Sequence, residues 1–373
     1  MHNVLVVGAG RVGSVIARDL SDDPTIHVTL ADTDEYRLTA LSKQMSITPL
    51  LADLKDPGPL AAAARDMDLV VGALPGHLGR HAMEGVVAAG KKGVDISFMA
   101  EDPRILCARA AETGSTVVYD FGVAPGMSNL LAAYEAFRLA PAETIEICVG
   151  GLPSVRREPW AYAAPFSPTD VIEEYVRPAR IRVDGKEVVR PPLSDVTHVD
   201  IPGIGTLEAF LSDGLRSMVD TVACPNMVEK TLRYPGHRDK VKLLLDTGFF
   251  SETPVTVGGV EVVPRDLSLA LLERAWHPDG NSDEFTVMHI DVRGAGGRRI
   301  WTLLDRTDPV RRESSMARTT GFPAAILVRM MLSGEVCLAP GVYPPEALAR
   351  VDGFVGALLA TLEIRGVKYE EKE

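Results

Sequence analysis

The sequence predicts an α/β protein in which a Rossmann-type, doubly wound parallel sheet is joined by a second α+β domain. Three observations predict this fold. A hydrophobic strand over residues 4–7 runs directly into a glycine-rich loop. Short β-branched strands then alternate with amphipathic helices through the first third of the chain, as in parallel sheets that carry helices on both faces. Beyond residue 122, strand-favouring segments dominate.

Hydrophobic patterning places the elements in order, because β-branched runs favour strands and apolar residues at helical spacing favour helices. The expected strands of the first part cover residues 4–7, 28–31, 69–71, 93–96 and 116–119, and its expected helices cover 12–20, 36–44, 60–64, 77–89 and 103–113. Later strands are expected over 144–150, 180–183, 197–200, 206–210, 255–257, 285–292 and 300–304, with helices over 129–138, 316–332 and 354–365. The late helices are long enough to fold back on the first domain.

The composition narrows the class of protein. The 373 residues carry a net charge of −12 and have a pI of about 5.2, whereas nucleic-acid-binding proteins are usually basic. The four cysteines lie far apart without a CxxC pair, which argues against a zinc site or a disulfide framework. The chain enters its first strand at once and has no apolar run of transmembrane length. We therefore expect a cytoplasmic protein without a metal site, membrane association or nucleic-acid partner.

The glycine loop is the first motif with a chemical meaning. Gly8 would allow the tight turn, Gly10 would let the backbone approach a pyrophosphate, and Gly13 would let the following helix pack against the strand. The N-terminus of that helix presents free N–H groups to phosphates. The alternative is a strand–turn–helix that binds no nucleotide. The loop reads Gly8-Ala9-Gly10-Arg11-Val12-Gly13.

Asp32 ends the second expected strand, about twenty residues beyond the loop, where a carboxylate binds the ribose hydroxyls. It would repel a 2′-phosphate, and no arginine follows in Thr33-Asp34, so we predict NAD rather than NADP. Asp53 is either an adenine contact or a helix cap. The segment Ala73-Leu74-Pro75 either skirts the cofactor or forms a plain strand-to-helix turn.

Several further blocks resemble the saccharopine dehydrogenase superfamily, most closely its lysine 6-dehydrogenase branch. The resemblance spans nearly the whole chain, and these blocks are more specific than the glycine loop. They are Asp120-Phe121-Gly122-Val123-Ala124-Pro125-Gly126-Met127, Val149-Gly150-Gly151-Leu152-Pro153, Gly205-Thr206-Leu207-Glu208-Ala209-Phe210, Thr231-Leu232-Arg233-Tyr234-Pro235-Gly236-His237 with Lys240 and Lys242, Ser315-Met316-Ala317-Arg318, and Gly341-Val342-Tyr343-Pro344-Pro345-Glu346.

The resemblance implies an NAD-binding domain, residues 1–122 and 316–373, interrupted by a substrate-binding and dimerisation domain, residues 123–315. It implies oxidation of the lysine side-chain amine to a semialdehyde with release of ammonia, and a homodimer formed through the sheet of the second domain. Saccharopine-forming relatives usually carry a larger second domain, so the modest length favours the lysine 6-dehydrogenase branch.

This chemistry needs a base, because only a neutral amine can release a hydride and the amine of free lysine has a pKa of about 10.4. His237 is a candidate because its unperturbed pKa suits proton transfer near neutrality. Lys240 and Asp120 are the other catalytic candidates, Asp120 because it follows a strand at the ligand-facing edge of the sheet. The structural alternatives are a capping histidine, an exposed lysine and a turn-capping aspartate.

The substrate carboxylate needs a cation, preferably a bidentate arginine. Arg233 and Arg318 are the candidates, although each can instead form an internal salt bridge, and Tyr162 is a weaker candidate. Two rival functions remain open: a sister enzyme that oxidises saccharopine or carboxynorspermidine, and a non-catalytic protein that senses NAD. The sequence has no GxSxG, HExxH or P-loop lysine motif, which removes the usual support for esterase, metalloprotease and nucleotide-hydrolase functions.

Overall fold

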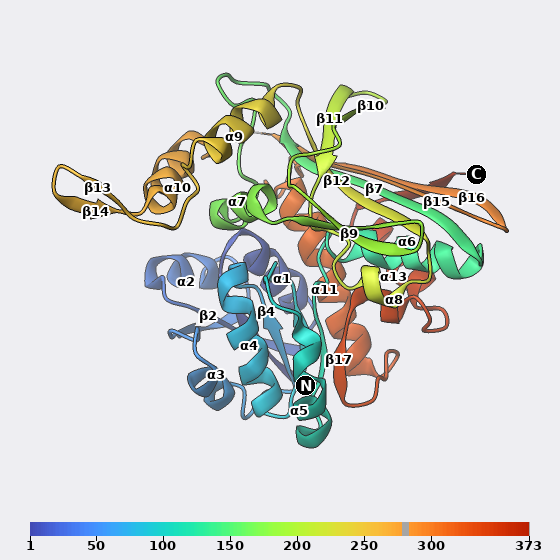
Figure 1. Ribbon diagram of the computed structural model, residues 1–373. Coiled ribbons are helices and arrows are strands. Elements are labelled where there is room, and N and C mark those ends of the chain that lie inside the picture. Colours follow the sequence, from blue (N-terminus) through green and yellow to red (C-terminus); the bar gives the residue numbers. More distant parts are fainter. Residues whose placement is uncertain (278–282, 373) are drawn as a thin grey trace. The chain divides into compact units, whose positions relative to one another are not determined.

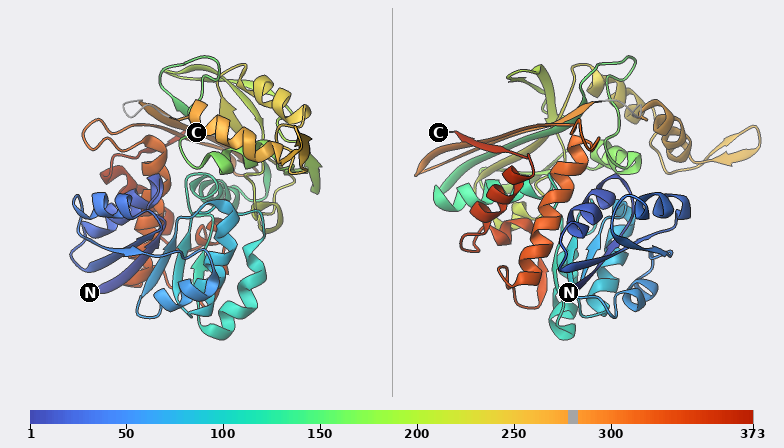
Figure 2. Two further views of the ribbon diagram at one scale, coloured as in Figure 1. Left: turned by 90° about the vertical axis from the view of Figure 1, so that its left-hand side faces the viewer. Right: turned by 180° about the vertical axis from the view of Figure 1, so that it is seen from behind.

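The computed structural model describes residues 1–277 and 283–372, which form two compact units (Figures 1 and 2). The first unit contains Met1–Tyr134 and Ala317–Lys368, and the second contains Glu135–Met316 and the residues from Tyr369 on. The division expected at 122/123 and 315/316 stays a prediction, and the two compact units divide at 134/135 and 316/317. The units also differ from the expected domains at the C-terminal end, where the last strand belongs to the second unit.

The first unit is built on a seven-stranded parallel sheet, which confirms the predicted Rossmann-type architecture. Helices α3 and α4 pack on one face of this sheet, where Leu60, Ala82 and Met83 share a core cluster with Leu5 and Val7. In chain order the elements are β1 (His2–Val7), α1 (Arg11–Ser21), β2 (Ile26–Asp32), α2 (Glu35–Ser42), β3 (Ile47–Leu51), α3 (Pro57–Ala63), β4 (Leu69–Gly72), α4 (Gly76–Ala88), β5 (Lys92–Asp95), η1 (Pro103–Leu106), α5 (Cys107–Thr113), β6 (Thr116–Val118), α6 (Met127–Arg138, which continues into the second unit), α11 (Ser315–Ser333, which begins there), β17 (Gly341–Tyr343), α12 (Pro345–Leu348) and α13 (Phe354–Ile364).

The strand order of this sheet is β17-β6-β5-β4-β1-β2-β3. The chain first builds outward from β1 to β2 and β3, and then crosses to β4 on the other side of β1. In open parallel sheets, ligands bind outside the carboxyl ends of the strands at such a switch point. The loops after β1, β2 and β4 are therefore the places to look for a binding site.

The C-terminal segment returns to the first unit, as the late helices suggested. Strand β17 extends the parallel sheet beside β6. The Asp19 carboxylate of α1 forms an ion pair with Arg329 of α11, and its Oδ1 accepts a hydrogen bond of 2.7 Å from Nε of Arg365, directly after α13. One carboxylate thus fastens two late helices to the first helix of the chain.

The second unit is built on a nine-stranded mixed sheet with the order β10-β11-β12-β7-β15-β16-β18, in which β8 pairs with β12 and β9. Strands β7 and β12 run parallel, while the other pairs are antiparallel. The elements are β7 (Ala142–Pro153), α7 (Pro168–Val176), β8 (Ala179–Val183), β9 (Lys186–Arg190), β10 (Thr197–Ile201), β11 (Gly205–Leu211), α8 (Met218–Thr221), β12 (Asn226–Arg233), α9 (His237–Asp246), β13 (Val255–Val257), β14 (Val260–Val262), α10 (Pro264–Ala275), β15 (Glu284–Gly294), β16 (Gly297–Arg306) and β18 (Tyr369–Lys372).

A single face of β11 and β12 carries the polar residues that matter below. Phe210 of β11 lies opposite Thr231 of β12, and Glu208 lies opposite Arg233. Helix α7 contributes to the cover of this face, since Tyr175 packs against Phe210 with the ring centroids 6.2 Å apart. Within the described parts of both units, no helix has the length and apolarity needed to cross a membrane.

Candidate functional site

The glycine loop after β1 has the geometry that its three glycines were expected to provide. Gly8 has a positive φ of 104°, and a Cβ there would lie 2.4 Å from the carbonyl oxygen of Ala73. A Cβ on Gly13 would lie 1.9 Å from the carbonyl oxygen of Gly8. Both positions therefore require glycine, because loop, β4 and α1 approach one another closely. A Cβ on Gly10, by contrast, would meet nothing within 4 Å.

The open side at Gly10 is where a phosphate group can approach the backbone. Helix α1 begins there, with Arg11 and Val12 as its first residues and with no side chain capping its N-terminus. Uncapped N–H groups at a helix N-terminus bind anions. This part of the chain therefore fits the pyrophosphate of a dinucleotide, with the tight contacts on the inner side of the loop and free space on the outer side.

Asp32 connects the end of β2 to this loop. Its Oδ2 accepts a hydrogen bond of 2.6 Å from the backbone N–H of Ala9, and its Oδ1 accepts one of 2.9 Å from the N–H of Asp34. Asp34 caps α2 by accepting from the N–H of Arg37. Two carboxylates thus stand at the carboxyl end of β2, the position from which a ribose is held.

The other predicted cofactor residues of this unit differ in whether they contact the glycine loop. Ala73 and Leu74 lie against Gly8 of the loop, and Pro75 is the N-cap of α4. Asp53 forms a 2.8 Å ion pair with Lys55, with about half of each side chain exposed. Ala73 and Leu74 are therefore next to the glycine loop, while the adenine contact of Asp53 stays a prediction.

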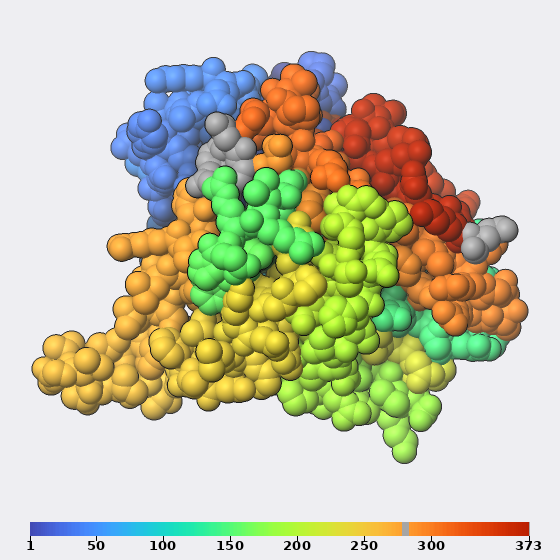
Figure 3. All heavy atoms as spheres, turned by 90° about the horizontal axis from the view of Figure 1, so that it is seen from above, coloured from blue at the N-terminus to red at the C-terminus, as the bar shows by residue number. Residues whose placement is uncertain are grey.

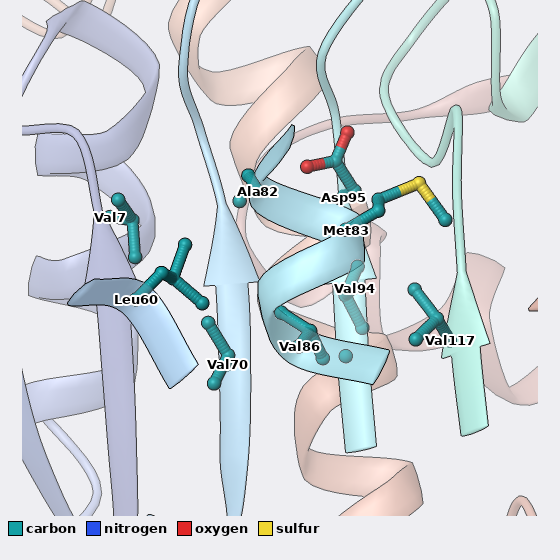
Figure 4. Close-up of a pocket in the computed structure, with 11 residues that line it drawn as sticks. Val7, Leu60, Val70, Ala82, Met83, Val86, Val94, Asp95 and Val117 are labelled. Atoms are coloured by element: carbon teal, nitrogen blue, oxygen red, sulfur yellow. The ribbon is translucent and has the colours of Figure 1, made fainter. Parts of the chain in front are cut away.

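Asp95, at the end of β5, is a buried carboxyl group that the sequence analysis did not single out. It is 3% exposed, and it lies so close to Gly72 of the neighbouring strand that a Cβ there would meet its Oδ2 at 1.9 Å. Its Oδ1 accepts a 2.8 Å hydrogen bond from the N–H of Ser97. Figure 4 shows its carboxylate at the rim of a small cavity that is otherwise lined mainly by apolar side chains such as Met83.

Burial is the main cause that raises the pKa of Asp95 to about 8, and the charge of Asp120 contributes to the same shift. Asp120 follows β6 and has a positive φ of 52°. The two carboxyl groups therefore belong to one end of the parallel sheet, and near neutral pH Asp95 holds a proton. Buried carboxyl groups with a shifted pKa are found at sites where enzymes transfer protons.

In the second unit, His237 lies in a buried aromatic cluster and both of its ring nitrogens are engaged. Nδ1 lies 3.1 Å from the carbonyl oxygen of Trp160, so it carries the proton and donates. Nε2 therefore accepts from the hydroxyl of Tyr175, 3.0 Å away. Burial first, and then the charge of Arg233, lower the pKa of His237 to about 3. The imidazole is consequently neutral in this cluster.

Arg233 completes the same network. Its Nε donates to the Tyr175 hydroxyl at 3.0 Å, and its Nη2 donates to Glu174 at 2.7 Å. Its guanidinium also lies 4.7 Å from the ring centroid of Tyr162, within the range of a cation–π contact. The structure thus brings together three of the predicted residues, His237, Arg233 and Tyr162, and balances the arginine charge with Glu174.

The two remaining candidates have other contacts. Nζ of Lys240 pairs with Glu158 at 2.8 Å and also donates to the carbonyl of Pro159. Nη2 of Arg318 donates to the carbonyl oxygen of Arg365 at 3.2 Å within the first unit. Their catalytic and substrate-binding roles stay predictions. Among residues 1–277 and 283–372, no three metal-ligating side chains gather into a group that could hold a metal ion.

Asp95, Glu174, Tyr175 and Trp160 are not among the residues that sequence patterns predicted. Asp95 carried a usable signal, since it lies near the end of the strand expected over residues 93–96, as Asp32 lies at the end of another. Glu174, Tyr175 and Trp160 carried none, because they meet Arg233 and His237 only through contacts between elements distant in sequence.

Comparison with known proteins bears on both units. A family model described as the saccharopine dehydrogenase NADP binding domain matches residues 4–118, and the saccharopine dehydrogenase C-terminal domain matches residues 122–367. The mitochondrial α-aminoadipic semialdehyde synthase of Bos taurus is 26% identical over 442 aligned positions, which cover 98% of this chain and 47% of that protein. The chain therefore spans about half the length of this curated relative.

A second relative matches over most of its length. The saccharopine dehydrogenase (NADP+, L-glutamate-forming) of Saccharomyces cerevisiae is 23% identical over 425 positions, covering 92% of this chain and 93% of that one. The apo structure of the histidine-tagged saccharopine dehydrogenase (L-Glu forming) from the same yeast superimposes with a TM-score of 0.81 at 21% identity, covering 100% and 99% of the two chains. The fold is therefore shared along the whole chain.

Replacing Asp95 with asparagine tests the buried acid. A carboxyl group whose pKa is raised on folding stabilises the fold below its unfolded pKa, and this contribution is lost as the pH rises toward 8. The isosteric amide does not titrate. We expect the free energy of unfolding of Asp95→Asn, relative to that of wild type, to rise between pH 5 and pH 9 by on the order of a few kcal/mol. Thermal unfolding of both proteins across this pH range measures the difference. A difference that stays constant with pH would show that Asp95 is ionised in the folded protein.

Proposed function

Because the chain belongs to the saccharopine dehydrogenase family, we propose that it is an NAD-dependent dehydrogenase that oxidises the side-chain amine of L-lysine. The products are the semialdehyde, which cyclises, and ammonia. The observation that carries the dehydrogenase part of the proposal is the glycine loop, which is open at Gly10 and is fastened to β2 by Asp32.

The proposal of NAD rests on the carboxylates at the end of β2, although the family model and the yeast relative name NADP. A 2′-phosphate would lie beside Asp32, whose charge repels it. Asp34 adds a second negative charge, and its Oδ2 lies 3.6 Å from Nε of Arg37, so this arginine of α2 already faces an acid. The ribose hydroxyls of NAD suit this environment because they donate hydrogen bonds to carboxylates.

A substrate with few carboxylates fits the second unit better than one with several. The charge of Arg233 is balanced by Glu174, and His237 is neutral, so their network offers no spare positive charge. Saccharopine carries additional carboxylate and would need additional cations. The alignments with both relatives also extend over more positions, 442 and 425, than the 373 residues of this chain. The relatives therefore contain insertions that this chain lacks, in line with a smaller substrate.

Asp120 is the group that we propose takes the proton from the substrate ammonium, leaving the neutral amine that the reaction requires. Asp95 supports this role, because its raised pKa keeps a proton at the same end of the sheet as Asp120. A bound NAD supplies the hydride acceptor for the carbon that bears the amine. Water then adds to the carbon–nitrogen double bond of the oxidised substrate, and cleavage of the carbon–nitrogen bond releases ammonium and leaves the aldehyde.

The other catalytic candidates keep their proposed roles, each with its own condition. For His237 to act as a base, the amine must replace the Tyr175 hydroxyl as the donor to Nε2, since that hydrogen bond occupies the lone pair. Lys240 would have to leave Glu158. Arg233 and Arg318 remain the proposed partners of the substrate carboxylate, with Tyr162 holding the guanidinium of Arg233 in place.

A second candidate function is oxidation of a secondary amine, either saccharopine or carboxynorspermidine. The observation that favours it is the name of the relatives, since the yeast protein that matches nearly the whole chain is a saccharopine dehydrogenase. We also propose a homodimer formed through the sheet of the second unit and a reducing, cytoplasmic setting. Four free cysteines support that setting.

The experiment that tests the function is NADH or NADPH formation at 340 nm with purified protein, both cofactors and a panel of L-lysine, saccharopine, carboxynorspermidine, ornithine and glutamate. We expect NADH to form with L-lysine and with no other amine of the panel. Activity restricted to saccharopine or carboxynorspermidine would replace lysine with the second candidate. Bound NAD without turnover of any amine would support a protein that senses NAD.

Replacement of Asp32 tests the cofactor assignment. Removing the carboxylate takes away the charged acceptor for the ribose hydroxyls and the hydrogen-bond partner of the Ala9 N–H. We expect Asp32→Ala to raise the Kd for NADH about tenfold or more and to narrow the preference for NADH over NADPH, as measured by nucleotide fluorescence titration. An unchanged ratio of the two Kd values would remove Asp32 from the specificity site.

Replacement of Asp120 tests the proton acceptor. Asp120→Asn keeps the size of the side chain but cannot take a proton, so kcat for the oxidised amine should fall about 10²–10⁴-fold. The Kd for NADH should change little, and this binding also confirms that the variant is folded. Full activity in Asp120→Asn would transfer the role to His237 or Lys240, whose variants His237→Asn and Lys240→Met are measured in the same series.

A further inference from the structure

Helix α10 is held firmly along one face. Arg265, in its first turn, forms ion pairs with Glu173 of α7 and with Glu252 at 2.7 Å. Ser268 donates a hydrogen bond of 2.8 Å to the carbonyl of Phe249. Leu272 is 5% exposed and belongs to the aromatic core cluster of the second unit. The helix therefore presents its opposite face in a fixed orientation.

That opposite face is apolar at its centre and charged at its two ends. Leu267 and Leu271 are 52% and 55% exposed, and Ala270 between them is exposed as well. Asp266 lies one helical turn before Ala270 and Arg274 one turn after it, so the three residues form a single line along the helix. Neither Asp266 nor Arg274 has an ion-pair partner in the part of the chain that the structure describes.

The hairpin that precedes α10 enlarges this exposed surface. Strands β13 and β14 pair with each other and, within the described residues, with no other strand. Figures 1 and 3 show the hairpin as an arm that extends beyond α10. Its Val255, Val257 and Val260 are 47%, 60% and 62% exposed. A two-stranded hairpin alone is marginally stable in water, so an arm of this kind with exposed valines gains stability by packing against a partner.

We propose that this face, defined as the outward side of α10 together with the β13–β14 arm, binds the same face of a second copy of this chain. When a two-fold axis lies perpendicular to α10, the α10 helices of the two copies run antiparallel and the same surface of each copy forms the contact. With the axis passing at Ala270, Asp266 of one copy faces Arg274 of the partner, and the reverse pair forms at the other end. The small side chain of Ala270 lets the helices approach closely.

The pattern of charges selects a second copy over other occupants. An acid, a small residue and a base at equal spacing are complementary to themselves only when the helix is reversed. The same two-fold axis places Leu267 and Leu271 of both copies on one flank, where they meet and lose contact with water. An anionic membrane surface fits poorly, because basic side chains should then surround the apolar residues. The arm and helix instead carry the acids Glu252, Glu261, Asp266 and Glu273, and Arg265 is already paired with acids.

This contact differs from the sheet-mediated homodimer proposed above and does not depend on the proposed activity. If both contacts form, each chain binds two others and the assembly is larger than a dimer, so loss of the α10 contact leaves a dimer. If only the α10 contact forms, the same loss converts a dimer to single chains. In either case the mass in solution falls at least twofold.

The test is light scattering on purified full-length protein, with charge reversal as the diagnostic step. Asp266→Arg or Arg274→Asp alone places like charges opposite each other and should weaken association at least tenfold, while the double variant Asp266→Arg/Arg274→Asp should restore it. Leu267→Asp/Leu271→Asp should lower the mass at least twofold, and Ile364→Asp, at a position 84% exposed on α13, should leave it unchanged. Wild-type protein that is already a single chain would overturn the proposal, and so would failure of the double reversal to restore association.

A cross-link tests the position of the axis directly. In a Cys337→Ser background, which removes the exposed native thiol, Ala270→Cys places two thiols across the two-fold axis. Mild oxidation should give a disulfide-linked pair of chains. Ala275→Cys, at an exposed position farther round the helix, is the control and should cross-link several-fold less. Equal cross-linking at the two positions would contradict the proposed pairing.

Discussion

The close approach of three segments at Gly8 is the constraint on which the first unit depends. A Cβ on Gly8 would collide with the carbonyl of Ala73, and a Cβ on Gly13 would collide with the carbonyl of Gly8. Loop, fourth strand and first helix can therefore meet only because two positions have no side chain. The hydrogen bond from Ala9 to Asp32 then fixes the loop to the second strand. The space left open at Gly10 is a consequence of this packing, and it faces the helix N-terminus that attracts phosphate.

The second unit solves a different problem, which is how to bury an arginine and a histidine among aromatic rings. The hydrogen bonds run in one direction, from Arg233 to the Tyr175 hydroxyl, from that hydroxyl to His237, and from His237 to the Trp160 carbonyl. These three donors each have an acceptor, and Glu174 balances the charge of Arg233. A chain of hydrogen bonds of this kind orients its members and resists ionisation of the imidazole. It therefore fixes the side chains around Arg233 at the end of β12.

Sequence patterns predicted what depends on neighbours along the chain. The glycine loop, the position of Asp32 and the return of the long helix α11 all follow from local spacing and hydrophobic periodicity. The partners of His237 could not be predicted, because Tyr175 lies 62 residues away from it and no motif joins them. Helix α10 is absent from the expected elements for a related reason: its outward leucines blur the apolar stripe that marks an ordinary amphipathic helix. The same outward leucines form the exposed face that we propose binds a second copy of the chain.

Family membership and cofactor choice are separable in this protein. The chain shares its fold along its whole length with the yeast structure, and the parallel sheet with its glycine loop can serve NAD and NADP equally well. Discrimination between them depends on one added phosphate, and only the few groups at the end of β2 contact that position. Asp32 also holds the loop through Ala9, so a phosphate could be accepted there only if the carboxylate that fastens the loop were displaced. The local charge and the local geometry both oppose a 2′-phosphate, and this supports the proposal of NAD.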